Sequence, residues 1–152
     1  MTNKITIEHN SQPVLDVLQQ LMERLGDLTE PMQEAAAALL DSTHQAFEDE
    51  ADPITGDPWE PLSDLYLKNN PKRAGGKKLR DTNILYTTIV SDYGTDWAEV
   101  GTNLQDYAAI HHFGGTADMP AGPKGIPARP YLGLSPQHEQ DLLEFLSDYL
   151  VN

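Results

Sequence analysis

The backbone of this chain is most constrained between Tyr107 and Ser135, a stretch that holds five of the eleven glycines and four of the eleven prolines. An aromatic-rich segment ends there at Gly114, a polar loop follows, and residues 126–131 (IPARPY) continue as a proline-containing run. Proline fixes its own φ and moves the preceding residue away from the helical region, so residues 126–131 are predicted to be stiff and extended. Composition alone is typical of an irregular loop, but this order of residues favours a segment that holds shape rather than one that carries chemistry.

Length and composition fit one folded domain. A chain of 152 residues can bury roughly two-thirds of its unfolded surface, so a single domain is predicted over residues 1–152. The chain has no cysteine, which excludes disulfides, thiolate metal sites and cysteine nucleophiles. No apolar run approaches the roughly 18 residues that span a bilayer, and the N-terminus lacks a signal-peptide pattern. We therefore expect neither a membrane partner nor secretion.

Charge is distributed unevenly along the sequence. The formal net charge is −14, yet residues 67–80 carry six cations and no acid. The acidic balance argues against nucleic acid as a general partner, because contacts to phosphate need Lys and Arg. The basic segment also contains Pro71 and Gly75-Gly76, a composition that predicts a mobile loop at about residues 68–80. Its cations are Lys68, Lys72, Arg73, Lys77, Lys78 and Arg80.

Three segments have the apolar spacing of amphipathic helices. The first runs from about Ser11 to Gly26, the second from about Thr29 to the acids before Pro53, and the third from Ser135 to the C-terminus. Serine before a proline is typical of a helix start, and glycine after the last apolar residue is typical of a helix end. Two N-terminal helices and one C-terminal helix are therefore predicted.

Shorter segments between these helices favour strands and turns. Residues 52–61 are predicted to form a turn-rich connector anchored by Trp59, and Tyr107–Phe113 a short helix ended by Gly114. Alternation or β-branched and aromatic content predicts three strands, at Lys4–Glu8, Ile84–Val90 and Trp97–Thr102. The expected fold class is α+β, a small mostly antiparallel sheet flanked by two N-terminal helices and one C-terminal helix.

The adjacent histidines His111 and His112 raise the question of a metal site. Neighbouring side chains diverge by about 100° on a helix and face opposite sides of a strand, so the pair cannot chelate one ion together. The helical zinc motif needs an i, i+4 spacing with a glutamate, and that spacing is missing. We expect one histidine to pack inward with a hydrogen bond and the other to meet solvent or a partner. No metal and no other cofactor is predicted.

No other motif in the chain predicts catalysis. The segment 52–57 (DPITGD) lacks the ligand spacing of a calcium loop and is predicted to be a turn closed by Gly56. Serine, histidine and aspartate are present without the G-x-S-x-G turn of a hydrolase. The glycine pairs lack the strand–glycine–helix context of a nucleotide-binding loop. The chain is therefore not predicted to be an enzyme.

The basic segment leaves three readings open and Arg129 leaves two. The six cations keep a solvated loop soluble, dock onto an acidic surface such as a neighbouring copy of this chain, or face DNA in a channel. The DNA reading is the least favoured of the three, because the acidic remainder of the chain would repel DNA. Arg129 lies between Pro127 and Pro130, which fix its backbone and lower the entropy lost when the guanidinium binds a carboxylate. That carboxylate is expected either within the chain, pinning the loop to the body, or in a neighbouring subunit.

The order of short motifs resembles the virion-morphogenesis, or tail-completion, proteins of contractile-tailed phages of the Mu type and related prophages. The resemblance covers about residues 47–135, with compatible helices on both sides. Asn83 and His112 depart from the glycine and glutamine that the family pattern leads us to expect. The matching pieces are Phe47, Asp52-Pro53, Gly56, Pro58-Trp59, Pro61-Leu62-Ser63, Leu79–Leu85, Glu99–Thr102, Tyr107-Ala108, Ile110-His111, Phe113–Gly115 and Ile126–Ser135.

The resemblance implies a structural protein of the virion that acts late in assembly, completing the tail or helping it join the head. Related proteins act as rings, commonly sixfold, so the implied partners are further copies of the chain and other tail or neck proteins. The expected interface comprises the six cations of the basic segment with His111, His112, Arg129 and Tyr131. The alternative from another class is a metal-dependent hydrolase that uses His111 or His112 with nearby carboxylates.

Overall fold

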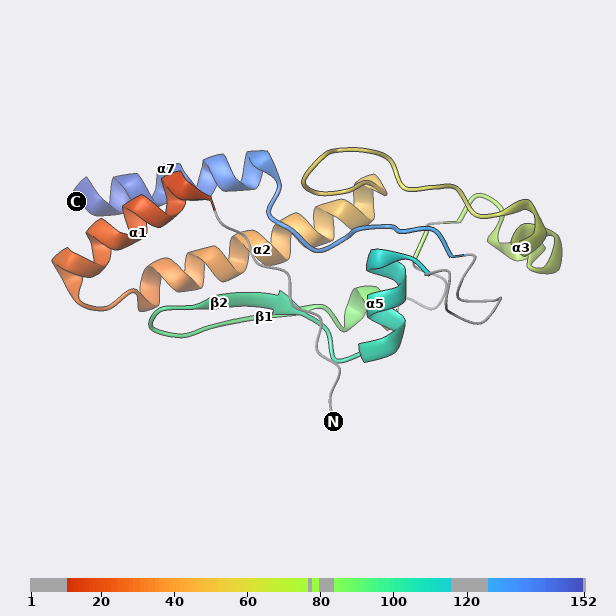
Figure 1. Ribbon diagram of the computed structural model, residues 1–152, viewed down its shortest axis with the longest axis horizontal. Helices are drawn as coiled ribbons and strands as arrows, with labels where there is room; N and C mark the ends of the chain where they lie inside the picture. The colour runs from red at the N-terminus through yellow and green to blue at the C-terminus, as the bar shows by residue number, and fades with distance from the viewer. Residues whose placement is uncertain (1–10, 77, 80–83, 116–125, 152) are drawn as a thin grey trace.

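One long helix organises the fold. In a computed structural model that describes residues 11–76, 78–79, 84–115 and 126–151, α2 (Thr29–Asp49) runs along the long axis of the molecule (Figure 1). The helices α1 (Gln12–Leu25) and α7 (Pro136–Val151) lie on one side of α2, and a β-hairpin lies on the other (Figure 1). This layered arrangement confirms the predicted α+β class.

The three long helices begin and end close to the predicted residues. Ser11 caps α1, its hydroxyl accepting a hydrogen bond from Val14 N, and Gly26 ends the helix with a left-handed φ of 72°. Helix α2 ends at Glu50, which also adopts a left-handed conformation. The Ser135 hydroxyl accepts from His138 N at 3.1 Å at the start of α7. Local capping signals thus mark both ends of α1 and the start of α7.

The hairpin pairs β1 (Val90–Tyr93) with β2 (Ala98–Gly101) in antiparallel register, with Val90 opposite Gly101 and Tyr93 opposite Ala98. Strand residues alternate between two faces. Ala98 and Val100 lie on the half-buried face toward α2, whereas Val90 lies on the exposed face. The predicted strand at Trp97–Thr102 is thereby confirmed.

The prediction of a strand at Ile84–Val90 is wrong, because most of this segment forms the short helix α4 (Ile84–Thr87) and only Val90 belongs to β1. Leu85 and Ile89, spaced i and i+4, are both buried in the core. Thr88 donates its hydroxyl to the carbonyl of Leu85 at 3.0 Å, which closes the turn locally. Burial of this i, i+4 pair outweighs the β propensity of the segment.

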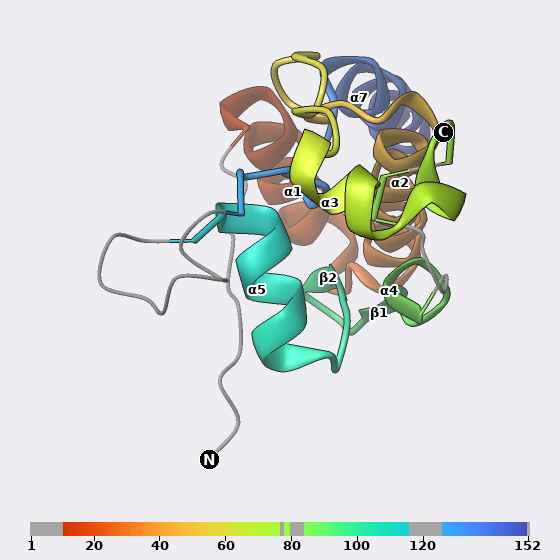
Figure 2. The same cartoon turned by 90° about the vertical axis from the view of Figure 1, so that its right-hand side faces the viewer.

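Short elements lie on the side of the molecule that faces the viewer in Figure 2. They are α5 (Gln105–Phe113), α3 (Asp64–Asn69) and the 3-10 turn Pro71–Arg73. Helix α5 ends at Gly114, φ 79°, as predicted. The segment predicted as a mobile basic loop therefore contains the end of α3 and a 3-10 turn, and its mobility stays a prediction. The predicted strand at Lys4–Glu8 lies outside the described residues.

Two hydrophobic clusters share α2. One lies near its C-terminal half around Phe47, Trp59 and Tyr131, and the other near its N-terminal half, where Met32 meets side chains of α1 and α7. Of the helices that the structure describes, none is both long and apolar enough to cross a bilayer.

Candidate functional site

The proline-containing run that dominates the sequence is held against the end of α5. Residues 126–135 run from α5 along α2 to the start of α7 (Figure 1). Gly115 N donates to Ile126 O at 2.8 Å, and Arg129 N donates to His111 O at 2.9 Å. A Cβ at Gly114 would lie 2.8 Å from Ala128 N, so the two backbones approach more closely than a side chain allows. The predicted rigid segment is therefore docked by its main chain.

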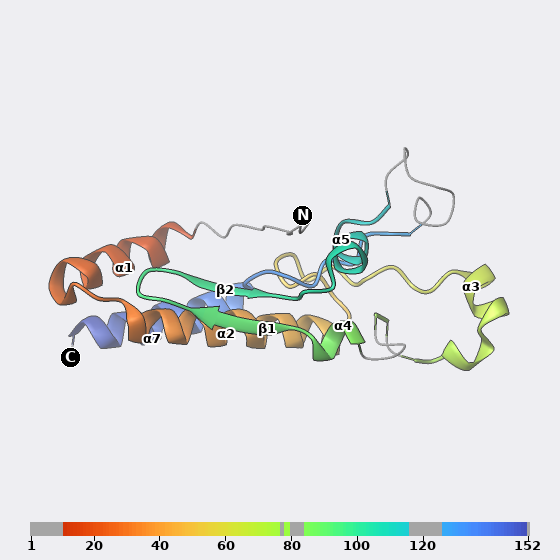
Figure 3. The same ribbon diagram turned by 90° about the horizontal axis from the view of Figure 1, so that it is seen from below.

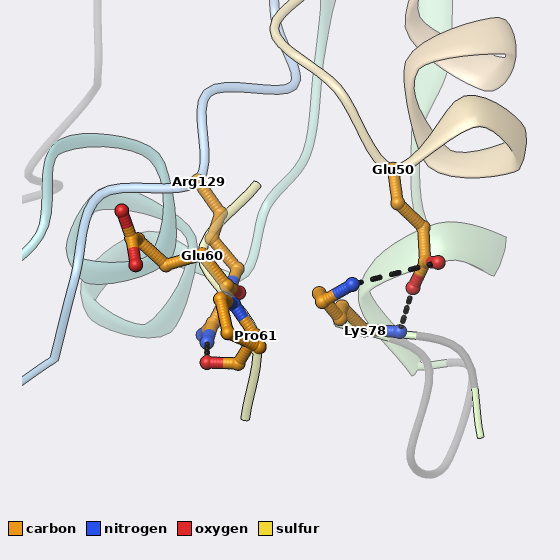
Figure 4. Close-up of polar contacts among 5 residues, drawn as sticks. All are labelled: Glu50, Glu60, Pro61, Lys78 and Arg129. Carbon is orange, nitrogen blue, oxygen red and sulfur yellow. Dashed lines mark hydrogen bonds and ion pairs between the residues drawn. The ribbon is translucent and has the colours of Figure 1, made fainter. Parts of the chain in front are cut away.

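Arg129 anchors this segment from its side chain. The guanidinium is buried, and its Nε and Nη2 donate to the carbonyls of Glu60 and Pro61 at 2.9 and 3.1 Å (Figure 4). Burial lowers the pKa of Arg129, while the nearby charges of Glu60 and Glu50 act in the opposite direction. Arg129 thus pins the segment to the rest of the chain, as one of the two interpretations predicted. The groups that accept its hydrogen bonds are main-chain carbonyls, however, and not the expected carboxylate.

His112 is the histidine that packs inward. Its Nδ1 accepts from Tyr131 N at 3.3 Å and from Leu132 N at 3.4 Å, so this nitrogen carries no proton. The ring meets Phe113 and Tyr131 edge to face, with ring centroids 4.7 and 5.2 Å apart. Burial lowers the pKa of His112, and the charge of Asp52 opposes the shift only in part. A neutral imidazole therefore serves here as a fixed acceptor for two backbone amides.

Tyr131 lies in the hydrophobic cluster that contains Phe47 and Trp59. Its side chain is fully buried, and its hydroxyl donates to Ala108 O at 2.8 Å. Phe47 packs on both Tyr131 and Trp59, with centroid separations of 5.4 and 5.6 Å. Trp59 Nε1 donates to Pro130 O at 2.6 Å, which confirms its predicted role as an anchor. Each polar group carried by these aromatic rings thus serves to fix the 126–135 segment.

Ser42 is a residue of this arrangement that sequence reasoning missed. It is buried in α2, where its hydroxyl donates to Gly133 O at 2.7 Å and accepts from Ser135 N at 2.8 Å. One side chain therefore joins the middle of α2 to the residues that start α7. The available signal was a serine within the apolar stripe of a predicted helix, where a hydroxyl needs a buried partner.

His111 differs from its neighbour. It is half-buried, and its pKa is lowered first by burial and then by the positive charge of Arg129. Within the described ranges, no group of three or more histidines and carboxylates is arranged to hold a metal ion. The geometry therefore gives no support to joint metal binding by His111 and His112.

The lowered pKa values of the two histidines predict a pH-dependent stability. The unfolded chain takes up protons below the ordinary histidine value of 6.5, whereas folded His111 and His112 resist protonation. The contribution of these two histidines to the free energy of unfolding should therefore be complete above pH 6.5. It should decrease as the pH is lowered through that value toward the folded pKa values. Urea titrations between pH 7.5 and 5.5 would measure this slope.

Glutamine at position 112 provides the specific test of the His112 contribution. The variant His112→Gln retains a side-chain acceptor but cannot titrate, so the slope between pH 7.5 and 5.5 should become shallower while the part due to His111 persists. An unchanged slope in the variant would contradict the assignment of a buried neutral imidazole to His112.

The basic segment is exposed over much of its length. Lys68 and Lys72 are exposed, whereas Arg73 is half-buried. Lys78 is held internally, with its Nζ 3.6 Å from Glu50 Oε2 and its main-chain N donating to Glu50 Oε1 at 2.6 Å (Figure 4). The remaining two predicted cations, Lys77 and Arg80, lie outside the described residues.

The residues expected to form one interface fall into two groups, because His111, His112, Arg129 and Tyr131 lie together beside α5 whereas Lys68 and Lys72 lie at α3 and the 3-10 turn, and their role as an interface stays a prediction. His112, Arg129 and Tyr131 are buried with internal partners, which leaves their side chains little surface for a neighbouring subunit. The exposed lysines, in contrast, remain accessible. The structure thus separates a buried clasp, formed by His112, Arg129 and Tyr131, from exposed lysines.

Comparison with known proteins identifies relatives over most of the chain. The phage virion morphogenesis family matches residues 9–151. The "Putative capsid assembly protein G" of Escherichia phage Mu is 42% identical over 132 residues, covering 84% of each chain. The "Mu-like prophage FluMu G protein 2" of Haemophilus influenzae (strain ATCC 51907 / DSM 11121 / KW20 / Rd) is 37% identical over 143 residues, covering 93% of this chain and 91% of the relative. No solved structure matches. The family match and these relatives show that the chain belongs to the phage virion morphogenesis family.

Proposed function

We propose that this protein is a structural component of the virion that completes the tail and supports the joining of tail to head, associating with copies of itself in a ring. The observation that carries the proposal is the separation of charge along an elongated protomer. The exposed cations Lys68 and Lys72 lie at the end formed by α3 and the 3-10 turn (Figure 1). Helices α1, α2 and α7 contain eleven acids and one basic residue other than histidine, Arg24.

Such a protomer favours contacts between unlike surfaces. When a patch on one subunit meets a different patch on the next, repetition closes a ring if the rotation allows it. Complementary charge also speeds the encounter and selects the partner. The name of the phage Mu relative, a putative capsid assembly protein, agrees with a role in building the particle. The further partners in this proposal are other tail or neck proteins of the same phage, and the place of action is the tail or neck.

The functional side chains support a mechanical role rather than a chemical one. Residues 126–135 are held in place by hydrogen bonds between side chains and the main chain. The side chains that make these bonds are those of Arg129, His112 and Tyr131. This clasp gives the protomer one defined shape, which repeated subunit contacts require. The alternative of a metal-dependent hydrolase based on His111 or His112 has no specific observation in its favour.

Loss of the gene from a phage or prophage that depends on it would test the function. We expect lysates to contain filled heads and tails that remain separate in electron micrographs, with infectivity restored when the protein is supplied from a plasmid. Assembly of normal, joined particles in its absence would contradict the proposal. If the phage without the gene made normal particles but accumulated an uncleaved substrate, an enzymatic function would be favoured instead.

A further inference from the structure

The end of the molecule opposite α3 carries both exposed apolar side chains and exposed acids. Here the loop between α1 and α2 meets the hairpin turn, and Leu28 N donates to Thr95 O at 3.1 Å (Figure 1). Four large apolar side chains near this junction are exposed, namely Met22 at 36%, Leu25 at 48%, Tyr93 at 37% and Trp97 at 44%. We call these four residues, with Glu23, Asp27, Asp92 and Asp96, the acidic tip.

Trp97 packs over a glycine of the hairpin turn while it remains exposed. A Cβ at Gly94 would lie 2.2 Å from Trp97 Nε1, so the indole lies directly over Gly94. The hairpin turn is closed by Gly94 N donating to Trp97 O at 2.9 Å. An exposed tryptophan offers a large contact area with only two side-chain torsions to immobilise on binding, which suits it to an interface.

The charge around this apolar group is mostly negative. The four acids of the acidic tip are exposed. The carboxylate of Asp27 accepts from the side chain and main chain of Thr29, which holds its pKa below the usual range and keeps it ionised. Arg24, the basic residue of this region, donates to Leu150 O. The acidic tip therefore attracts a basic partner.

We propose that the acidic tip binds the basic end of a second copy of this chain, formed by α3 and the 3-10 turn with Lys68 and Lys72. Charge complementarity identifies the occupant, since these exposed lysines belong to the one strongly basic segment of the sequence. The two surfaces lie at opposite ends of the long axis (Figures 1 and 3). One protomer therefore presents both halves of a repeating head-to-tail contact. This inference rests on the proposed assembly function, to which it adds the contacting surfaces.

Cysteine cross-linking tests the contact within assembling phage. The natural chain has no cysteine, so introduced thiols report only on their own positions. The double variant Asp96→Cys/Lys72→Cys would be supplied to a phage lacking the gene, and the lysate treated with a short thiol-specific cross-linker. We expect a ladder of multimers on denaturing gels. Either single variant should give dimers at most, because one thiol cannot link more than two chains.

A matched control moves one thiol to a different exposed site. Val90 is 63% exposed on the outer face of the hairpin. It lies at the end of the hairpin away from the turn and is not part of the acidic tip. The double variant Val90→Cys/Lys72→Cys should give no ladder. Joined, infectious particles that contain the Asp96→Cys/Lys72→Cys protein but yield no ladder would overturn the contact while leaving the assembly function intact. Normal particles formed without the protein would overturn the assembly function itself.

Charge exchange provides a second, independent measurement. Lys68→Glu/Lys72→Glu and Glu23→Lys/Asp96→Lys should each lower the phage titre at least tenfold, because like charges then face each other. The fourfold variant that combines both changes restores opposite signs and should recover most of the titre. Matching thermal melting curves would show that all three variants fold. A fourfold variant no better than its parents would count against the pairing.

Discussion

Replacing Phe47 with alanine is expected to lower the free energy of unfolding by about 3–5 kcal/mol, the range for large-to-small changes at buried aromatic sites. Phe47 is fully buried and contacts the rings of Trp59, Tyr86 and Tyr131. These rings come from separate parts of the chain, so they cannot collapse around the cavity without moving the segments that they anchor. The loss is a large fraction of the stability of about 5–15 kcal/mol that is typical of a domain.

Urea denaturation followed by tryptophan fluorescence would measure this loss, since Trp59 lies beside the substitution. Phe145→Ala is the matched control, because Phe145 is 39% exposed on α7 and its removal leaves a smaller cavity. We expect the control to cost clearly less. Equal losses at the two positions would show that Phe47 is not the centre of the core.

Gly114→Ala should cost about 2–5 kcal/mol, from two causes. The first is the left-handed φ of 79°, which costs a residue with a Cβ about 1–2 kcal/mol. The second is the close approach of the docked segment, where the new Cβ would lie 2.8 Å from Ala128 N and 3.1 Å from Ile126 O. Main-chain atoms cannot rotate away as a flexible side chain does, so overpacking adds about 1–3 kcal/mol.

Gly56→Ala separates these two causes. Gly56 has the same φ of 79°, but a Cβ there would meet nothing within 4 Å. The control variant should therefore lose only the conformational part, about 1–2 kcal/mol. Thermal and urea unfolding of both variants would give the difference. If Gly114→Ala cost no more than Gly56→Ala, residues 126–128 would not be held against α5 as the structure describes.

The helices could be predicted because their signals are local. Ser11, Gly26 and Ser135 mark helix ends through their own hydrogen bonds or backbone conformation, and the apolar spacing between them is regular. The segment Ile84–Val90 could not be predicted in the same way. Its β-branched residues favour a strand, and only the position of the finished core shows that Leu85 and Ile89 must point in the same direction.

The sequence predicted that residues 126–131 would be stiff, but it did not predict which groups they contact. The prolines around Arg129 indicate a fixed guanidinium, and the structure shows one. The choice of acceptor depends on where the 52–61 connector passes in space, which the sequence does not encode locally. For the same reason, Ser42 shows its role only when Gly133 and Ser135 lie beside it. Such pairings between distant parts of a chain require the tertiary structure.

The shared position of α2 in both hydrophobic clusters has a mechanical consequence. A continuous helix of 21 residues spans about 30 Å. Because both clusters pack on this one helix, neither cluster can shift relative to the other unless α2 bends. Helix α2 therefore joins the two clusters into one rigid body.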